Sequence, residues 1–145
     1  ILSAFYGILK PMDGVTPYRL EMQAKAEIEE KTNLYDYWGD RLYHSVIDDS
    51  RTIINLASKE YSKCIERYLS DKDNYITITF CELSGDKLVT KGTYAKMARG
   101  EMVRFMAENN IENPVDIQKF DRLGYTFRGN LSSETEYVFE RKIIK

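Results

Sequence analysis

The amino-acid sequence predicts an α/β (mixed α+β) fold, in which helices pack against a mixed β-sheet that includes two β-hairpins. Three observations favour this class. Residues 75–82 alternate between apolar and β-favouring polar side chains, as a strand of a half-buried sheet does. Residues 94–109 instead repeat their apolar side chains at helical spacing. Turn sequences at 84–86 and around Gly129 and Asn130 join neighbouring candidate strands.

The N-terminal segment predicts a helix, a loop and a strand. Apolar side chains in residues 2–10 recur at i, i+3, i+4 and i+7, which predicts a helix that Pro11 ends. Residues 11–17 contain two prolines and Gly14 and predict a loop. Residues 18–28 alternate for much of their length and predict a strand with one solvent-exposed face, although several of them are also good helix formers.

The middle of the chain predicts two helices around a buried strand. Residues 34–48 carry a helical apolar pattern, and Asn33 is placed to cap its start. Residues 52–57 form a short β-branched run that is typical of a buried strand. Ser58 then caps a helix that extends to about Tyr68.

The remaining elements complete the two hairpins. Residues 87–93 return from the first turn as a strand. Pro114, at an N-terminal helical position, begins a short helix over 114–121. Residues 124–130 and 135–144 predict the second hairpin.

Length and composition predict one domain over residues 1–145. Apolar residues make up 43% and charged residues 30% of the chain, which is enough apolar material for a core. The formal net charge of −2 excludes a protein that is basic overall but allows a local basic patch. No apolar run approaches the ~18 residues of a membrane span. The sequence opens directly on an apolar segment at Ile1, so we expect the chain to be part of a longer protein.

The cysteines and the histidine restrict the chemistry. Cys64 and Cys81 are the only cysteines and lack CxxC spacing, so they fit a reducing cytoplasm and cannot form a zinc site alone. The single histidine, His44, removes multi-histidine metal centres and disfavours a Ser-His-Asp hydrolase. We expect no metal, no cofactor and no thiol turnover, with Cys81 on a partly exposed strand face.

The helix over 94–109 carries the clearest candidate surface. Lys96, Arg99, Gly100 and Val103 share the side opposite the apolar sector, and Arg104 flanks it. Gly100 costs a helix about 1 kcal/mol relative to alanine, which favours close approach of a ligand or another backbone. The alternative is a solvated surface with a glycine that packs against a neighbouring helix.

Three further groups of polar residues lie near the predicted element ends. Arg19 and Glu21 share one face of the 18–28 strand and can pair, while Trp38 and Asp40 flank a glycine. The last group lies where a strand runs into a helix and consists of Asn55, Ser58, Glu60 and Tyr61. Ligands collect at the carboxyl ends of strands, and anions at helix N-termini. Because no known catalytic or phosphate-binding motif is present, these residues indicate a polar cleft without a defined reaction.

Four longer motifs together resemble the YaaA family of bacterial peroxide-stress proteins. In chain order they are LSAFYGILKPMDGVTPYRLEM, LYDYWGD, INLASKEY and YAKMARGEMVRFMAENN. Each motif is weak alone, but their order and spacing cover nearly the whole chain. Family members are longer and open with a segment similar to IISPAKT, so this chain resembles their C-terminal portion.

The resemblance implies a protein that limits oxidative damage by hydrogen peroxide and keeps free intracellular iron low. One member is described as a DNA-binding protein with a fold of its own, a positively charged cleft and a helix-hairpin-helix element. By resemblance, the residues that bind nucleic acid or another ligand are Arg19, Asn55, Ser58, Lys96, Arg99 and Arg104. The residues that support the cleft are Tyr18, Glu21, Trp38, Asp40, Glu60, Tyr61 and Gly100.

Two classes of function remain open. The first is sequence-independent binding of double-stranded or bubble DNA, with an affinity that falls steeply with salt. The alternative is an enzyme that acts on a nucleobase or nucleotide in the same cleft. In either case we expect Arg19, Asn55, Ser58 and Lys96 to meet in one depression.

Overall fold

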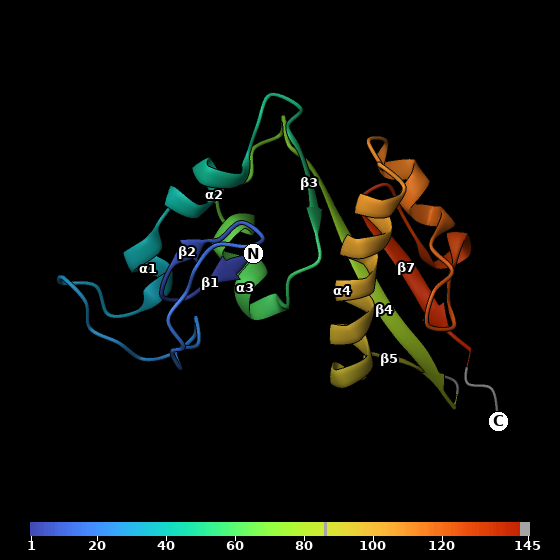
Figure 1. Cartoon of the computed structure of the whole chain (residues 1–145), viewed down its shortest axis with the longest axis horizontal. Coiled ribbons are helices and arrows are strands. Elements are labelled where there is room, and N and C mark those ends of the chain that lie inside the picture. The colour runs from blue at the N-terminus through green and yellow to red at the C-terminus, as the bar shows by residue number, and fades with distance from the viewer. Residues whose placement is uncertain (86, 143–145) are drawn as a thin grey trace. The chain divides into compact units, whose positions relative to one another are not determined.

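A computed structural model describes residues 1–85 and 87–142 of the chain (Figure 1). The chain forms two compact units, which are treated separately below. The helical unit comprises Ile1–Ile53 and Ala57–Asn74. The sheet unit comprises Ile54–Leu56 and the chain from Tyr75 onward. The mixed α/β class is confirmed, because both units combine helices with strands and the larger sheet is mixed.

The helical unit begins with a β-hairpin, so the helix predicted over 2–10 is wrong. Strands β1 (Leu2–Ser3) and β2 (Gly7–Ile8) pair antiparallel. The Ser3 hydroxyl accepts hydrogen bonds from the backbone N–H groups of Phe5 and Tyr6 at 3.3 and 2.9 Å. Such local side-chain bonds compete with a helix for backbone donors.

Gly7 shows why the hairpin turns where it does. Its φ is +77°, a left-handed conformation that favours glycine. A Cβ atom at this position would lie 2.8 Å from Cη2 of Trp38, so the indole occupies the space that a side chain would need. A long-range aromatic contact therefore selects the hairpin over the helix that the local pattern predicts.

The strand predicted over 18–28 is also wrong. This segment is a loop, and its one ladder contact is an isolated bridge between Ile28 and Lys31. Met22 alone is fully buried, at 0% exposure, and Gln23 donates its N–H to the Glu60 carboxylate at 3.3 Å. Alanine, glutamate and lysine have low strand propensity, so alternation without a partner strand does not produce a strand.

The helices of this unit are close to the prediction. The 34–48 helix is split into α1 (Leu34–Trp38) and α2 (Arg41–Val46), because Gly39 adopts a φ of +54° between them. Asn33 caps α1 as predicted, since its side chain accepts the Asp36 N–H at 3.0 Å.

Helix α3 (Lys59–Glu66) begins directly after Ser58, as predicted. The Ser58 hydroxyl makes no capping bond, whereas its backbone carbonyl accepts the N–H groups of Tyr61 and Ser62. The helix ends two residues before the predicted Tyr68.

The larger sheet has the order β3–β4–β7–β6, with β5 paired to β4. Parallel pairing of β4 and β7 combines with antiparallel pairing of β6 and β7. Both predicted hairpins are present, although Asp86 of the first turn and residues 143–144 of the last predicted strand lie outside the described residues. A 3₁₀ turn, η2 (Gly129–Leu131), forms part of the second connection. The strand bounds are β3 (Thr52–Asn55), β4 (Asn74–Ser84), β5 (Lys87–Val89), β6 (Tyr125–Phe127) and β7 (Glu136–Arg141).

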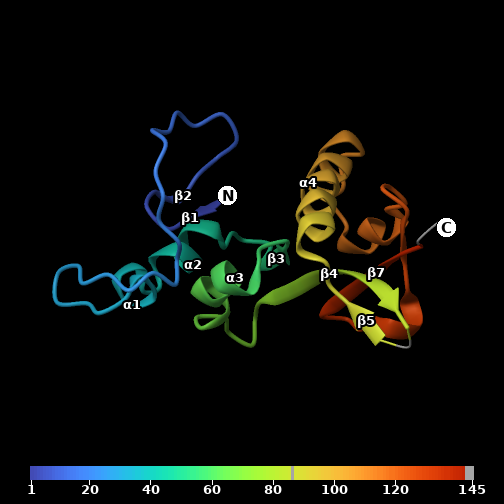
Figure 2. The same cartoon turned by 90° about the horizontal axis from the view of Figure 1, so that it is seen from below.

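Helix α4 (Gly92–Glu108) packs along the sheet and confirms the helix predicted over 94–109 (Figure 2). Pro114 begins a 3₁₀ helix, η1 (Pro114–Lys119), in place of the short helix predicted there. The core between these elements is largely aromatic. Its buried members include Ile78, Phe80, Ala98, Met102, Phe105, Phe120, Tyr125 and Phe139.

Over residues 1–85 and 87–142, the structure contains no helix with the length and apolarity of a membrane crossing. The same residues gather no group of three or more potential metal ligands.

Candidate functional site

One side of α4 carries two cationic side chains that are not paired with carboxylates. Lys96 is exposed and Arg99 is half-buried, with Val103 one turn further along. Within the described part of the chain, neither cation forms an ion pair, and the buried Nε of Arg99 has no hydrogen-bond partner. Burial lowers the pKa of Arg99, although an arginine remains charged at neutral pH. A desolvated charge of this kind is costly unless an anion neutralises it.

Gly100 leaves the helix backbone open beside these two cations. A Cβ atom added there would meet no heavy atom of the described residues within 4 Å beyond the adjacent residues and the helix's own backbone. A packing role against a neighbouring helix, the alternative that the sequence left open, therefore does not explain this glycine among the described residues. The open backbone lets a large anion approach the helix closely.

Arg104 differs from the other two cations because it is already paired. Its Nε donates to Glu108 at 2.6 Å, and the other Glu108 oxygen accepts from Arg122 at 2.8 Å. Arg122 also donates to Glu101 at 2.8 Å, so four charges of alternating sign form a chain along α4. The Glu108 hydrogen bond raises the pKa of Arg104. Arg104 is thus less available to an external anion than the helical wheel indicates.

Asn55, on β3, has a structural contact. The residue is buried and donates from Nδ2 to the Thr77 hydroxyl at 3.3 Å, which links β3 to β4. This bond accounts for a polar side chain in the sheet interior.

In the helical unit, Tyr18, Glu21, Glu60 and Tyr61 lie close together. Burial raises the pKa of Tyr61, and the charges of Glu60, Tyr18 and Glu21 contribute to this shift. Tyr18 bonds the Ser3 hydroxyl at 2.5 Å. Its ring packs against Phe5 and Tyr6. The sequence resemblance named these four polar residues, and the fold brings them to the start of α3.

Arg19 and Glu21 do not form the ion pair that a shared strand face predicts. Both are exposed on the loop that replaces the strand, and within residues 1–85 no carboxylate pairs with Arg19.

Trp38 and Asp40 have local structural contacts. The Trp38 indole N–H donates to the Ala4 carbonyl at 2.9 Å and fixes the N-terminal hairpin on α1. Asp40 is exposed and lies 3.3 Å from His44. Glu60 likewise holds the 18–28 loop through its carboxylate, while its backbone carbonyl accepts the Tyr35 hydroxyl at 2.9 Å.

The depression predicted to join four of these residues spans both units. Arg19 and Ser58 belong to the helical unit, whereas Asn55 and Lys96 belong to the sheet unit. Their convergence stays a prediction.

Both cysteines are buried. Cys64 is 3% exposed, and burial raises its pKa to about 11. Cys81 is 4% exposed, which corrects the partly exposed position predicted for it. Its thiol lies 3.5 Å from the Phe139 carbonyl on the paired strand, and burial raises its pKa as well. Neither thiol has the exposed, low-pKa character of a redox sensor.

The structure contains one polar cluster that the sequence patterns did not predict, formed by Glu82, Lys91 and Arg141. Glu82 is only 1% exposed, yet its carboxylate binds Lys91 at 2.9 Å and Arg141 at 3.1 Å. A glutamate near the end of an apolar strand was the available signal, but its partners lie 9 and 59 residues away in the sequence.

Comparison with known proteins places these features in a family. The family model described as "Peroxide stress protein YaaA" matches residues 1–131. A UPF0246 protein of Agathobacter rectalis is 80% identical over 143 residues, which cover 99% of this chain and 57% of the relative. A UPF0246 protein of Lachnoclostridium phytofermentans is 57% identical over 139 residues, which cover 96% of this chain and 54% of the relative. The chain thus spans about half the length of the curated relatives it matches.

Proposed function

Because the chain belongs to the YaaA family of peroxide stress proteins, we propose that it protects DNA by binding the phosphate backbone through Lys96 and Arg99 of α4. The half-buried Arg99 guanidinium, which has no carboxylate partner among the described residues, is the observation that carries this proposal. Binding would take place in the bacterial cytoplasm, where the chromosome lies.

Phosphate is the anion that this arrangement suits best. An arginine binds a phosphate oxygen pair through parallel N–H bonds, and such charge-assisted bonds are among the strongest in proteins. Lys96 lies one turn before Gly100 on the same side of α4, so a phosphate above the glycine can contact both cations. The contacts are made to the backbone and carry no base readout, so we expect sequence-independent binding to duplex and bubble DNA.

Phosphate binding also offers a link to peroxide stress. Iron held at DNA phosphates reacts with peroxide next to the sugars that it damages. Lysine and arginine side chains that occupy phosphates displace the cations bound there. Protection of this kind limits iron-dependent damage without a metal site or a reactive thiol in the protein.

The test is DNA binding by the protein at its natural length, measured by fluorescence anisotropy with labelled duplex and bubble DNA over a range of salt concentrations. We expect K96Q and R99Q each to weaken binding to every DNA sequence. Each should also reduce the slope of the logarithm of the binding constant against the logarithm of the salt concentration (the salt slope) by about one. R104Q is the matched control, because Glu108 already neutralises Arg104 on the same helix. An unchanged salt slope for R99Q, or an equal loss for R104Q, would contradict the proposal.

The alternative function is an enzyme that acts on a nucleobase or nucleotide in the same cleft. Trp38, Asn55 and Glu60 each form a separate structural contact with the backbone or a neighbouring hydroxyl. Catalysis would require such groups to face one reacting atom.

A further inference from the structure

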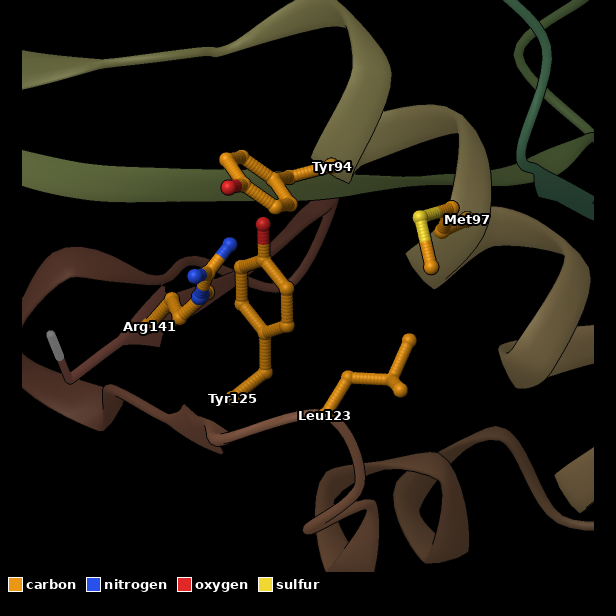
Figure 3. A pocket seen from close by; sticks show the side chains of 5 residues that line it. All are labelled: Tyr94, Met97, Leu123, Tyr125 and Arg141. Atoms are coloured by element: carbon orange, nitrogen blue, oxygen red, sulfur yellow. The ribbon is translucent and has the colours of Figure 1, made fainter. Parts of the chain in front are cut away.

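The sheet unit contains a pocket that the DNA proposal does not use. The cavity has a volume of about 190 Å³ and is lined by Tyr94 and Met97 of α4 together with Leu123, Tyr125 and Arg141. Figure 3 shows these five side chains arranged around one common space. The other three residues come from the loop before β6 (Leu123), the start of β6 (Tyr125) and the end of β7 (Arg141).

One end of the pocket carries an excess of positive charge. Arg141 donates to the buried Glu82 at 3.1 Å, and Lys91 binds the other Glu82 oxygen at 2.9 Å. Two cations on one carboxylate leave a net charge of +1 in this cluster. An arginine has five N–H donors. Arg141 uses them on Glu82 and on the hydroxyls of Tyr94 and Tyr125, so the guanidinium is fixed in place and two donors are left for a ligand.

The pocket walls are aromatic and apolar. The Arg141 guanidinium lies over the Tyr94 ring, 3.8 Å from its centroid. Tyr125 is 2% exposed, and its hydroxyl points toward Arg141 and Tyr94 (Figure 3). Burial raises the pKa of Tyr125, so the phenol stays neutral and can donate a hydrogen bond. Met97 and Leu123 are half-exposed at the opposite wall, which leaves the mouth open.

Leu123 gives a second, independent observation. Its φ is +55°, in the left-handed region that a branched side chain rarely adopts. This conformation holds the Leu123 side chain at the pocket and out of the aromatic core. Five other described non-glycine residues also have positive φ, but among the residues that line the pocket Leu123 is the one that does. Backbone strain of this kind clusters at functional sites.

We propose that this pocket binds a small organic anion with one flat apolar ring and a single carboxylate or phosphate group. The ring lies between the tyrosines and the Met97–Leu123 wall, and the anionic group binds Arg141. A cation at one end of apolar walls is the usual composition of a small-molecule site. The residues involved are distinct from Lys96 and Arg99, so the two proposals can fail separately.

The first experiment compares matched probes by NMR titration of the protein at its natural length. Benzoate and phenyl phosphate carry both the ring and the charge, and their relative affinities decide between the two anionic groups. Benzyl alcohol has the ring without the charge, whereas acetate and inorganic phosphate have the charge without the ring. We expect the incomplete probes to bind about tenfold more weakly than the better complete one, because each lacks either the ion pair or the ring contact.

The second experiment uses two variants and a control. L123G removes one wall and relieves the left-handed strain, so we expect a retained fold and about fivefold weaker binding of the better complete probe. R141Q removes the cation, so that probe should bind no better than benzyl alcohol. V115A changes an exposed apolar residue on η1 and should leave the affinity unchanged.

Three outcomes would overturn the proposal: no binding of either complete probe at millimolar concentration, equal affinity for the better complete probe and benzyl alcohol, or full affinity for that probe in a folded L123G variant.

Discussion

Cys64 shows at the scale of a single residue how burial decides reactivity. Its pKa of about 11 lies far above neutral pH, so on the order of one thiol in a thousand is ionised at pH 8. We predict that iodoacetamide labels the folded protein at pH 8 far more slowly than the urea-unfolded protein, because the thiolate is the reacting species. The rate should rise as the pH approaches the raised pKa.

Mass spectrometry of the labelled peptides measures this reactivity at Cys64 and Cys81 separately. The C64S/C81S double variant provides the cellular control, since peroxide resistance should persist without either thiol. Rapid labelling of folded protein, or loss of resistance at an unchanged protein level, would restore a direct redox role.

At the scale of the element, α4 combines a helix-weakening glycine with two cations that have no ion-pair partner among the described residues. Beyond the adjacent residues and the helix's own backbone, no described atom lies within 4 Å of a Cβ built on Gly100. G100A should therefore increase the free energy of unfolding by about 1 kcal/mol through helix propensity alone. For a domain of this size, that gain raises Tm by about 2–4 °C. The added methyl group should weaken DNA binding, because it occupies the space over the helix backbone.

Calorimetry and anisotropy on the same G100A sample test both halves of this expectation. V103A, on the same side of α4, is the control and should leave DNA affinity unchanged. A G100A variant that gains stability and keeps full DNA affinity would show that phosphate does not approach the helix at Gly100.

The elements also show which parts of the fold and of the site could be predicted from sequence patterns and which could not. Alternation and spacing predicted α4, β4 and both C-terminal hairpins, because these patterns match the faces that the sheet unit buries. The pattern over 2–10 failed because the Trp38 ring, distant in sequence, fills the space at Gly7. In the site, the helical wheel correctly grouped Lys96 and Arg99. It could not show that Arg122, from another element, completes the neutralisation of the charges beside Arg104.

At the scale of the whole molecule, the helical unit depends on one buried carboxylate, that of Asp73, which lies next to the last residue of the unit, Asn74. The Asp73 side chain is fully buried, binds Arg51 at 2.6 Å, and accepts the Tyr43 hydroxyl at 2.8 Å and the Ser70 N–H at 2.7 Å. Burial acts to raise the pKa of Asp73, but these partners outweigh it and hold the pKa below its ordinary value of 3.8.

Stability should therefore depend on Asp73 in acid. A folded-state pKa below the unfolded one stabilises the protein above about pH 4, and this contribution is lost as the pH falls through the folded-state pKa. We predict that D73N lowers Tm at pH 7 and reduces the further loss of Tm between pH 5 and about pH 2. Thermal unfolding followed by circular dichroism measures both effects. D71N, an exposed neighbour, is the control, and an acid profile of D73N that parallels the unsubstituted protein would refute the assignment.

The position of β7 in the sheet has a consequence for synthesis on the ribosome. This strand is the last one described in the chain, yet it lies inside the sheet between β4 and β6. Until it emerges, β6 has no ladder partner, and one edge of the long apolar β4 stays unpaired in the nascent chain. Parallel pairing between segments this far apart is slow to form, and exposed strand edges promote association between chains. Translation that stalls before residue 136 would therefore release a chain that cannot close its sheet and that depends on chaperones to stay dispersed.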